Sequence, residues 1–77
     1  MLIIVLVDKT ILSIYCRNII DEAIALKDEI NQFISSGGKV ITINERNVWI
    51  EKVRNDEMMV SDISVIVDNI LYMYVKR

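Results

Sequence analysis

The sequence contains no histidine, no proline and a single cysteine, Cys16. Histidine is the usual general base near neutral pH and the commonest metal ligand, so both roles lack their standard side chain. A Ser–His–Asp or Cys–His nucleophile system is therefore excluded, within one subunit and in a homo-oligomer. One cysteine also cannot supply the four cysteine or histidine ligands of a structural zinc site. We expect no catalytic residues, no metal site and no cofactor, and predict that the protein is not an enzyme.

The single cysteine excludes an internal disulfide bond, which favours a reducing compartment. We expect Cys16 to be a small buried strand residue, because free cysteine is among the most buried residue types. The apolar start of the chain has no basic segment and is interrupted by Asp8, unlike a signal peptide. Together these features predict a cytoplasmic protein.

Glycine is also scarce, and the two glycines are the adjacent pair Gly37 and Gly38. A loop that cradles phosphate needs spaced glycines leading into a helix, whereas this pair follows a helical pattern and precedes a predicted strand. Glycine adopts the left-handed conformation after a helix without steric cost. We therefore expect the pair to end a helix.

Neither sign of charge dominates, since nine basic and eleven acidic residues give a formal net charge of −2. This balance argues against a general nucleic-acid binder, whose affinity rests on neutralising phosphates. The carboxylates often occur as adjacent pairs, but neighbouring residues on a helix point in different directions. We interpret them as solvent-facing charge. Residues 39–54 form the one net-positive element of any length.

Apolar residues are in excess, at 53% of the chain, where about 45–50% is usual even with glycine counted. A domain this small buries only about 60% of the surface of its unfolded chain. Large exposed apolar patches usually mark interfaces, so we expect a homo-oligomer, most simply a two-fold dimer. The isoleucine-rich, proline-free composition hints at an AT-rich genome, such as that of a phage or another mobile element.

The chain contains an internal repeat, because residues 40–49 repeat the residue pattern of residues 3–12. In each copy an apolar run meets an acidic residue followed by a basic one, and a second stretch rich in β-branched residues begins soon after. A match at one fixed offset is typical of a repeated supersecondary unit. We expect a single domain, residues 1–77, built from two hairpin–helix units that span residues 2–36 and 39–75.

The first unit begins with two apolar stretches, residues 2–7 and 10–16, which predict a hairpin closed around residues 8–9. This two-residue loop would place Ile4 opposite Ser13. Both faces of the hairpin would then be apolar, as expected for strands covered on both sides. An acid–base pair is a poor two-residue turn, because such turns prefer asparagine or glycine at positive φ. A longer loop with another register is the alternative.

Residues 10–17 have a second interpretation, because their apolar residues also fall on the spacing of a helix that continues to residue 33. We favour a break near Arg17, since Asn18 and Asp21 resemble the capping pattern that starts a helix. A helix is then predicted from Asn18 to Ser35, with acidic residues in its first turn.

The second unit is predicted to contain a hairpin, residues 39–44 paired with residues 47–53, and a helix from Ser61 to about Val75. This helix is apolar over most of its circumference, so it would be buried on more than one side, which again favours an oligomer. Asp62 and Asp68 argue against a membrane span, because an aspartate at the centre of the bilayer costs about 2.5–3.5 kcal/mol.

The predicted fold is α+β in the order ββαββα. An antiparallel sheet would be formed by the two hairpins, both helices would pack on one face of it, and two chains would form a dimer. This architecture, without catalytic groups, favours a small interaction or regulatory protein that acts by binding another macromolecule. The alternative is a nucleic-acid-binding dimer that uses the second hairpin, residues 39–54, because a two-stranded ribbon can enter a major groove and aromatic and basic side chains can contact bases and phosphates.

Two sets of residues follow from this reading. The candidates for contact with a partner or with nucleic acid are Arg46, Trp49, Lys52 and Arg54. The candidates for the oligomer interface are Ile66, Ile70, Met73 and Tyr74.

Overall fold

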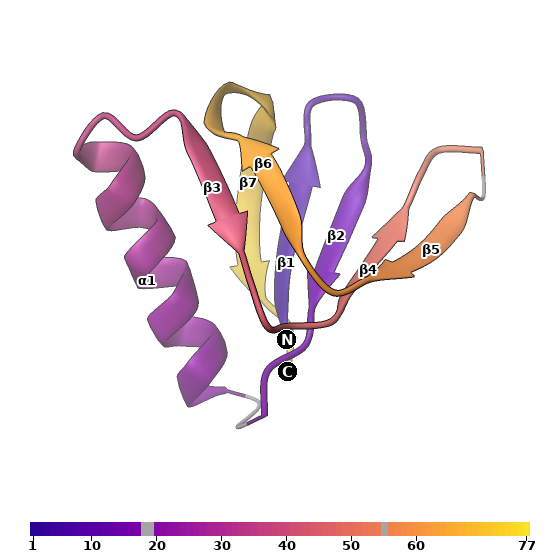
Figure 1. The fold of residues 1–77 in the computed structure, drawn as a ribbon, viewed down its shortest axis with the longest axis horizontal. Coiled ribbons are helices and arrows are strands. Elements are labelled where there is room, and N and C mark those ends of the chain that lie inside the picture. Colours follow the sequence, from indigo (N-terminus) through magenta and orange to yellow (C-terminus); the bar gives the residue numbers. More distant parts are fainter. Residues whose placement is uncertain (18–19, 55) are drawn as a thin grey trace.

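A computed structural model describes residues 1–17, 20–54 and 56–77 (Figure 1). This part of the chain forms one α-helix, α1 (Asp21–Ser35), a short 3₁₀ turn, η1 (Val67–Asn69), and seven strands. In chain order the strands are β1 (Leu2–Leu6), β2 (Ile11–Ile14), β3 (Val40–Ile43), β4 (Val48–Glu51), β5 (Glu57–Val60), β6 (Ile63–Ile66) and β7 (Ile70–Val75).

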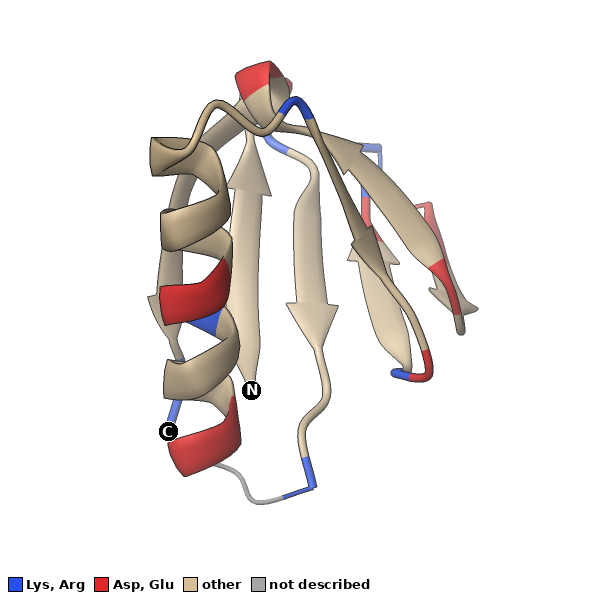
Figure 2. Ribbon diagram, turned by 60° about the vertical axis from the view of Figure 1, so that its left-hand side comes forward, with Lys and Arg blue, Asp and Glu red and all other residues tan. Residues whose placement is uncertain are grey.

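The strands form two separate sheets. Five of them make an antiparallel sheet in the order β5-β4-β2-β1-β7, and β3 and β6 make an antiparallel two-stranded ribbon. Helix α1 and the β3–β6 ribbon lie over the same face of the five-stranded sheet, because their buried side chains belong to one common core (Figures 1 and 2). We call this face of the large sheet the inner face.

The core follows from the two-residue period of the strands. Alternate residues of β1, β2 and β4 point to the inner face, and α1 and the ribbon add their own apolar side chains above them. Fully burying one such aliphatic side chain is worth about 1.5–3 kcal/mol. The fully buried side chains of the inner face are Leu2, Ile4, Leu12, Ile14 and Val48.

The first hairpin is present, but its predicted register is wrong by one residue. The Leu6 carbonyl accepts the Lys9 N–H at 2.9 Å, and the Thr10 carbonyl accepts the Leu6 N–H at 2.9 Å. The loop therefore holds three residues, with Lys9 in the left-handed region at φ 74°. As a result Ile4 lies opposite Leu12 and not Ser13, and residues 11–14 are a strand and not part of a helix.

The predicted second hairpin is wrong. Strand β3 pairs with β6, whereas β4 pairs with β2 on one side and β5 on the other. The chain crosses from the ribbon to the large sheet between Ile43 and Val48, with Glu45 at φ 60°. The repeat in the sequence thus marks two strand–turn–strand stretches. Only the first folds back on itself, because β4 instead completes the otherwise unpaired edge of β2.

The predicted helix from Ser61 to Val75 is wrong as well, so the order ββαββα does not describe the fold. This region contains β6, η1 and β7. Its valines, isoleucines and tyrosines favour strands. The apolar residues that would surround a helix instead belong to β6 in the ribbon and to β7 in the large sheet. Strand β7 pairs along β1 with a bulge between Val5 and Leu6. Without β7, the strongly apolar β1 would be an open edge.

The helix predicted to start at Asn18 is present as α1, although that residue lies outside the described part of the chain. The helix ends as expected at the glycine pair. Gly37 has φ 89° and donates its N–H to the Ile34 carbonyl at 3.0 Å, and Gly38 donates to the Phe33 carbonyl at 2.9 Å. These two bonds are the Schellman pattern that satisfies the last carbonyl groups of a helix.

Candidate functional site

The face of the five-stranded sheet opposite α1 and the ribbon is covered by no described element (Figure 2). It carries the side chains that alternate with the core residues, and we call it the open face. Cross-strand pairing places these side chains in rows. One row is Tyr74, Ile3, Ser13, Trp49 and Met59, and the next is Tyr72, Val5, Ile11, Glu51 and Glu57.

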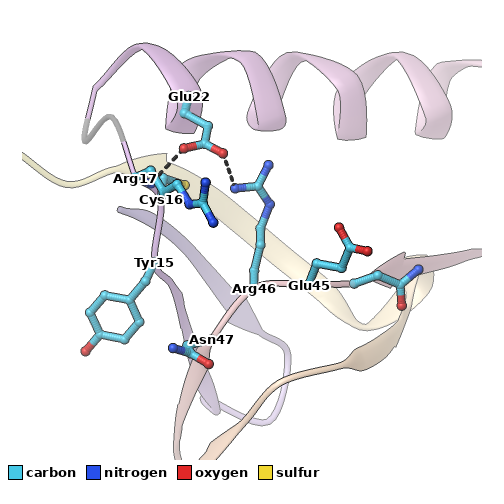
Figure 3. A pocket seen from close by; sticks show the side chains of 8 residues that line it. Tyr15, Cys16, Arg17, Glu22, Glu45, Arg46 and Asn47 are labelled. Atoms are coloured by element: carbon cyan, nitrogen blue, oxygen red, sulfur yellow. Dashed lines mark hydrogen bonds and ion pairs between the residues drawn. The ribbon is translucent and has the colours of Figure 1, made fainter.

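Aromatic side chains are concentrated on the open face. The chain has three tyrosines and one tryptophan, and all four belong to it. Tyr72, Tyr74 and Tyr15 have exposed fractions of 53%, 45% and 44%. Tyr15 continues the alternation of β2, since its N–H pairs with the Asn47 carbonyl at 3.0 Å, and Figure 3 shows its ring pointing away from α1. The tyrosine rings of β7 stack, with centroids 6.1 Å apart.

The centre of the open face is shielded although no described element packs on it. Ile3 and Val5 of β1 are only 3% and 6% exposed. Their neighbours across the ladder are Tyr74 and Tyr72 on one side, and large side chains on adjacent strands reach over one another. The open face therefore has an apolar strip along β1, with the larger tyrosine side chains of β7 along one side of it.

Charge on the open face lies at one end. Strands β1, β2 and β7 contain no charged residue, whereas Glu51 and Glu57 lie opposite each other on β4 and β5. The carboxylate of Glu51 accepts the indole N–H of Trp49 at 3.2 Å. Two like charges across a ladder repel each other, and together they make this end of the face acidic.

The four candidate contact residues do not form one cluster. Trp49 lies on the open face, in the row that also contains Ile3. Arg46 precedes β4 and points to the helix side, where its guanidinium pairs with Glu22 at 2.5 Å. Lys52 and Arg54 follow the other end of β4 and are exposed. Their grouping in the sequence depended on a hairpin that is not formed.

The candidate interface residues are also spread over different surfaces. Ile66 is exposed on the ribbon, at the end of β6. Ile70 and Met73 are half-buried and pack against the core. Tyr74 lies on the open face, because successive residues of a strand point to opposite sides.

A polar cavity of about 560 Å³ lies where α1 begins (Figure 3). One carboxylate organises it: Glu22 accepts the backbone N–H of Arg17 at 2.7 Å and the guanidinium of Arg46 at 2.5 Å. The half-buried thiol of Cys16 also lines the cavity and lies 3.8 Å from the Ile14 carbonyl. The described residues contain no group of three or more acidic, cysteine or histidine side chains that could hold a metal ion. The Glu22 contacts join α1 to two connecting segments, which is a structural role.

Sequence reasoning missed Tyr15 and Tyr72 as members of the site. The signal was present, because Tyr72 and Tyr74 alternate with Leu71, Met73 and Val75 at the two-residue period of a strand. If the same residues are assigned to a helix, the two tyrosines lie on different sides of it. The helix prediction therefore did not reveal that they share a face.

Comparison with known proteins gives no relative: no family model matches the chain, and neither the curated proteins nor the solved structures yielded a match. Among the described residues, no helix has both the length and the apolar character needed to cross a membrane.

Proposed function

We propose that this protein is a non-enzymatic interaction protein that binds another protein in the cytoplasm through the open face of its five-stranded sheet. The position of the aromatic residues supports the proposal. A ring buried in the core would contribute up to about 3 kcal/mol, yet Tyr72 and Tyr74 are half exposed on a face that no described element covers. Tyrosine and tryptophan carry much of the binding energy at protein interfaces.

The charge of the open face favours a protein partner over nucleic acid. Single-stranded nucleic acid is the alternative, because bases stack on aromatic side chains exposed on a sheet. The charged residues within the two rows, however, are Glu51 and Glu57, which repel phosphate groups. An apolar protein surface complements the face, and the two glutamates disfavour a polyanion.

The simplest partner is a second copy of the chain. Two open faces can pack against each other as a two-fold sandwich, in which sheets align at about 30°. Such a dimer would cover the exposed tyrosines of both copies and would account for the excess of apolar residues in the sequence.

The test is partner capture from the native host with the wild-type chain and with the double variant Tyr72→Ser, Tyr74→Ser. We expect the double variant to lose the captured partners and keep its far-UV CD spectrum. Ile66→Ser is the matched control, because it removes an equally exposed apolar residue from the ribbon. Nuclease treatment separates the two classes of partner. Unchanged capture by the double variant would refute the open face as the binding site.

A further inference from the structure

A groove of about 600 Å³ separates α1 from β3, on the side of the molecule away from the open face. The two elements lie side by side and run in opposite directions (Figure 1). The volume lies within the range of about 300–1,000 Å³ typical of ligand sites. Apolar side chains form both walls. The groove is lined by Leu26, Glu29, Ile30 and Phe33 of α1, by Val40, Ile41, Thr42 and Ile43 of β3, and by Asn44 and Arg46.

One wall of the groove is the edge of a strand. Within the described residues, β3 pairs only with β6. The Lys39 carbonyl accepts the Val67 N–H at 2.9 Å, and backbone groups in an antiparallel ladder alternate in direction. Ile41 therefore directs its N–H and C=O to β6, and Val40 and Thr42 direct theirs to the opposite edge. Both of these residues line the groove, so their backbone donors and acceptors are available to another strand.

The groove also has a charge preference. Arg46 lines one end, but its guanidinium is neutralised by Glu22. Glu29 lies among the apolar residues of the helix wall and forms no ion pair with the described residues. The uncompensated charge that lines the groove is therefore negative, and an occupant with a basic side chain complements it.

We propose that this groove binds an extended peptide segment of a partner protein, which adds to β3 as a third strand of the ribbon. In strand addition the main-chain hydrogen bonds supply affinity and the alternate side chains supply specificity. The segment alternates apolar residues, which contact the wall containing Ile30 and Phe33, with polar ones, and it carries a lysine or arginine next to Glu29. This site is separate from the open face, and its occupant does not depend on what the open face binds.

The test uses a random library of peptides of about six residues, the usual length of a strand, with both termini blocked. We expect the wild-type chain to retain peptides that alternate apolar with polar residues and contain a basic one. Bound peptide should protect the amide protons of Val40 and Thr42 from exchange. Thr42→Pro removes one of the edge donors, and a proline is tolerated at an edge position whose N–H faces outward. It should reduce retention at least about tenfold, the loss expected for one unsatisfied hydrogen bond.

Two control variants match the test variants. Ser64→Pro places a proline on the far edge of the same ribbon and removes the same Thr42–Ser64 side-chain contact of 3.3 Å, so it should retain the peptides. Glu29→Lys should reverse the charge preference, so that the variant retains acidic peptides instead of basic ones. Asp28→Lys changes the charge equally at the neighbouring position of α1, outside the groove lining, and should leave the preference unchanged.

The outcomes decide the proposal even where Thr42→Pro fails to fold, because Glu29→Lys tests the same groove without altering the backbone. Retention of no peptide by the wild-type chain overturns the proposal. The proposal is also overturned if a folded Thr42→Pro variant retains the peptides as well as the wild type does, or if Glu29→Lys leaves the charge preference unchanged. None of these results bears on the open face, whose test uses Tyr72 and Tyr74.

Discussion

The carboxylate of Glu22 and the guanidinium of Arg46 meet at 2.5 Å although 24 residues separate them in the sequence. Glu22 also accepts the backbone N–H of Arg17 at 2.7 Å. One side chain in the first turn of α1 thus contacts both Arg17, which follows β2, and Arg46, in the segment that crosses between the two sheets. Both groups are partly buried, so solvent screens the pair less than it screens an exposed ion pair.

Replacing Glu22 by alanine should destabilise the fold. Hydrogen bonds to charged groups contribute about 1.5–3 kcal/mol, and we expect a loss of this size in the free energy of unfolding, measured by urea denaturation. Asp28→Ala removes an exposed acidic side chain from the same helix and should change stability by less than about 0.5 kcal/mol. Equal effects of the two substitutions would show that the Glu22 contacts contribute nothing.

Replacing Lys9 by glycine should stabilise the protein. Lys9 closes the β1–β2 loop at φ 74°, a conformation that costs a residue with a Cβ about 1–2 kcal/mol and glycine almost nothing. Lys27→Gly is the contrasting control, because glycine inside α1 should cost about 1 kcal/mol. Thermal unfolding should therefore shift in opposite directions for the two variants. A lower melting temperature for Lys9→Gly would contradict the loop geometry.

The stability of the protein should fall in acid partly because of Asp8. The backbone N–H of Thr10 donates to the Asp8 carboxylate at 2.9 Å and, together with the Thr10 hydroxyl, lowers the pKa of that carboxyl below its ordinary value of 3.8. A group whose pKa is depressed by folding stabilises the protein above its unfolded pKa, and this contribution is lost as the pH falls through the folded pKa.

Asp8→Asn isolates this contribution, because the amide oxygen can still accept the Thr10 N–H but carries no charge. We expect the free energy of unfolding to decrease less steeply in the variant than in the wild type below about pH 4. Urea denaturation at several pH values measures the two slopes. Identical slopes would show that the turn does not discriminate between the charged and the neutral carboxyl.

Trp49 gives a test of self-association. We expect sedimentation of the wild-type chain to give twice the monomer mass of 8.9 kDa, and Trp49→Ala to shift the protein toward the monomer with its far-UV CD spectrum retained. Trp49 is only partly buried between its cross-strand neighbours Ser13 and Met59, so its loss should leave the core intact. A wild-type monomer at micromolar concentration refutes the dimer, and unfolding of the variant assigns Trp49 to the core.

Local signals in the sequence predicted local structure. The Gly37-Gly38 pair ends α1 as expected, and the first hairpin joins neighbouring segments through a short loop. The sequence could not reveal pairings between distant segments, such as β1 with β7 or β3 with β6. The apolar residues of the segment 61–75 fit both the spacing of a helix and that of a strand. The choice between helix and strand is made by the pairing of β7 with the free edge of β1.

The candidate site was predictable only in part for the same reason. Trp49 and Tyr74 were singled out for different surfaces, and cross-strand pairing through β2 and β1 places them in one row. Arg46, Lys52 and Arg54 are close in sequence but lie at opposite ends of β4. Each was assigned from its sequence neighbours, whereas a sheet face is composed of residues from distant strands.

The pairing of β1 with β7 also determines how the molecule would respond to mechanical force. Met1 and Lys76 exchange hydrogen bonds of 2.9 and 3.0 Å, so β1 begins and β7 ends at the same end of one antiparallel ladder. Pulling on the two residues would load the hydrogen bonds of this ladder one after another, from that end inward. The molecule would open strand by strand under low force, although the same contacts hold β1 in place at rest.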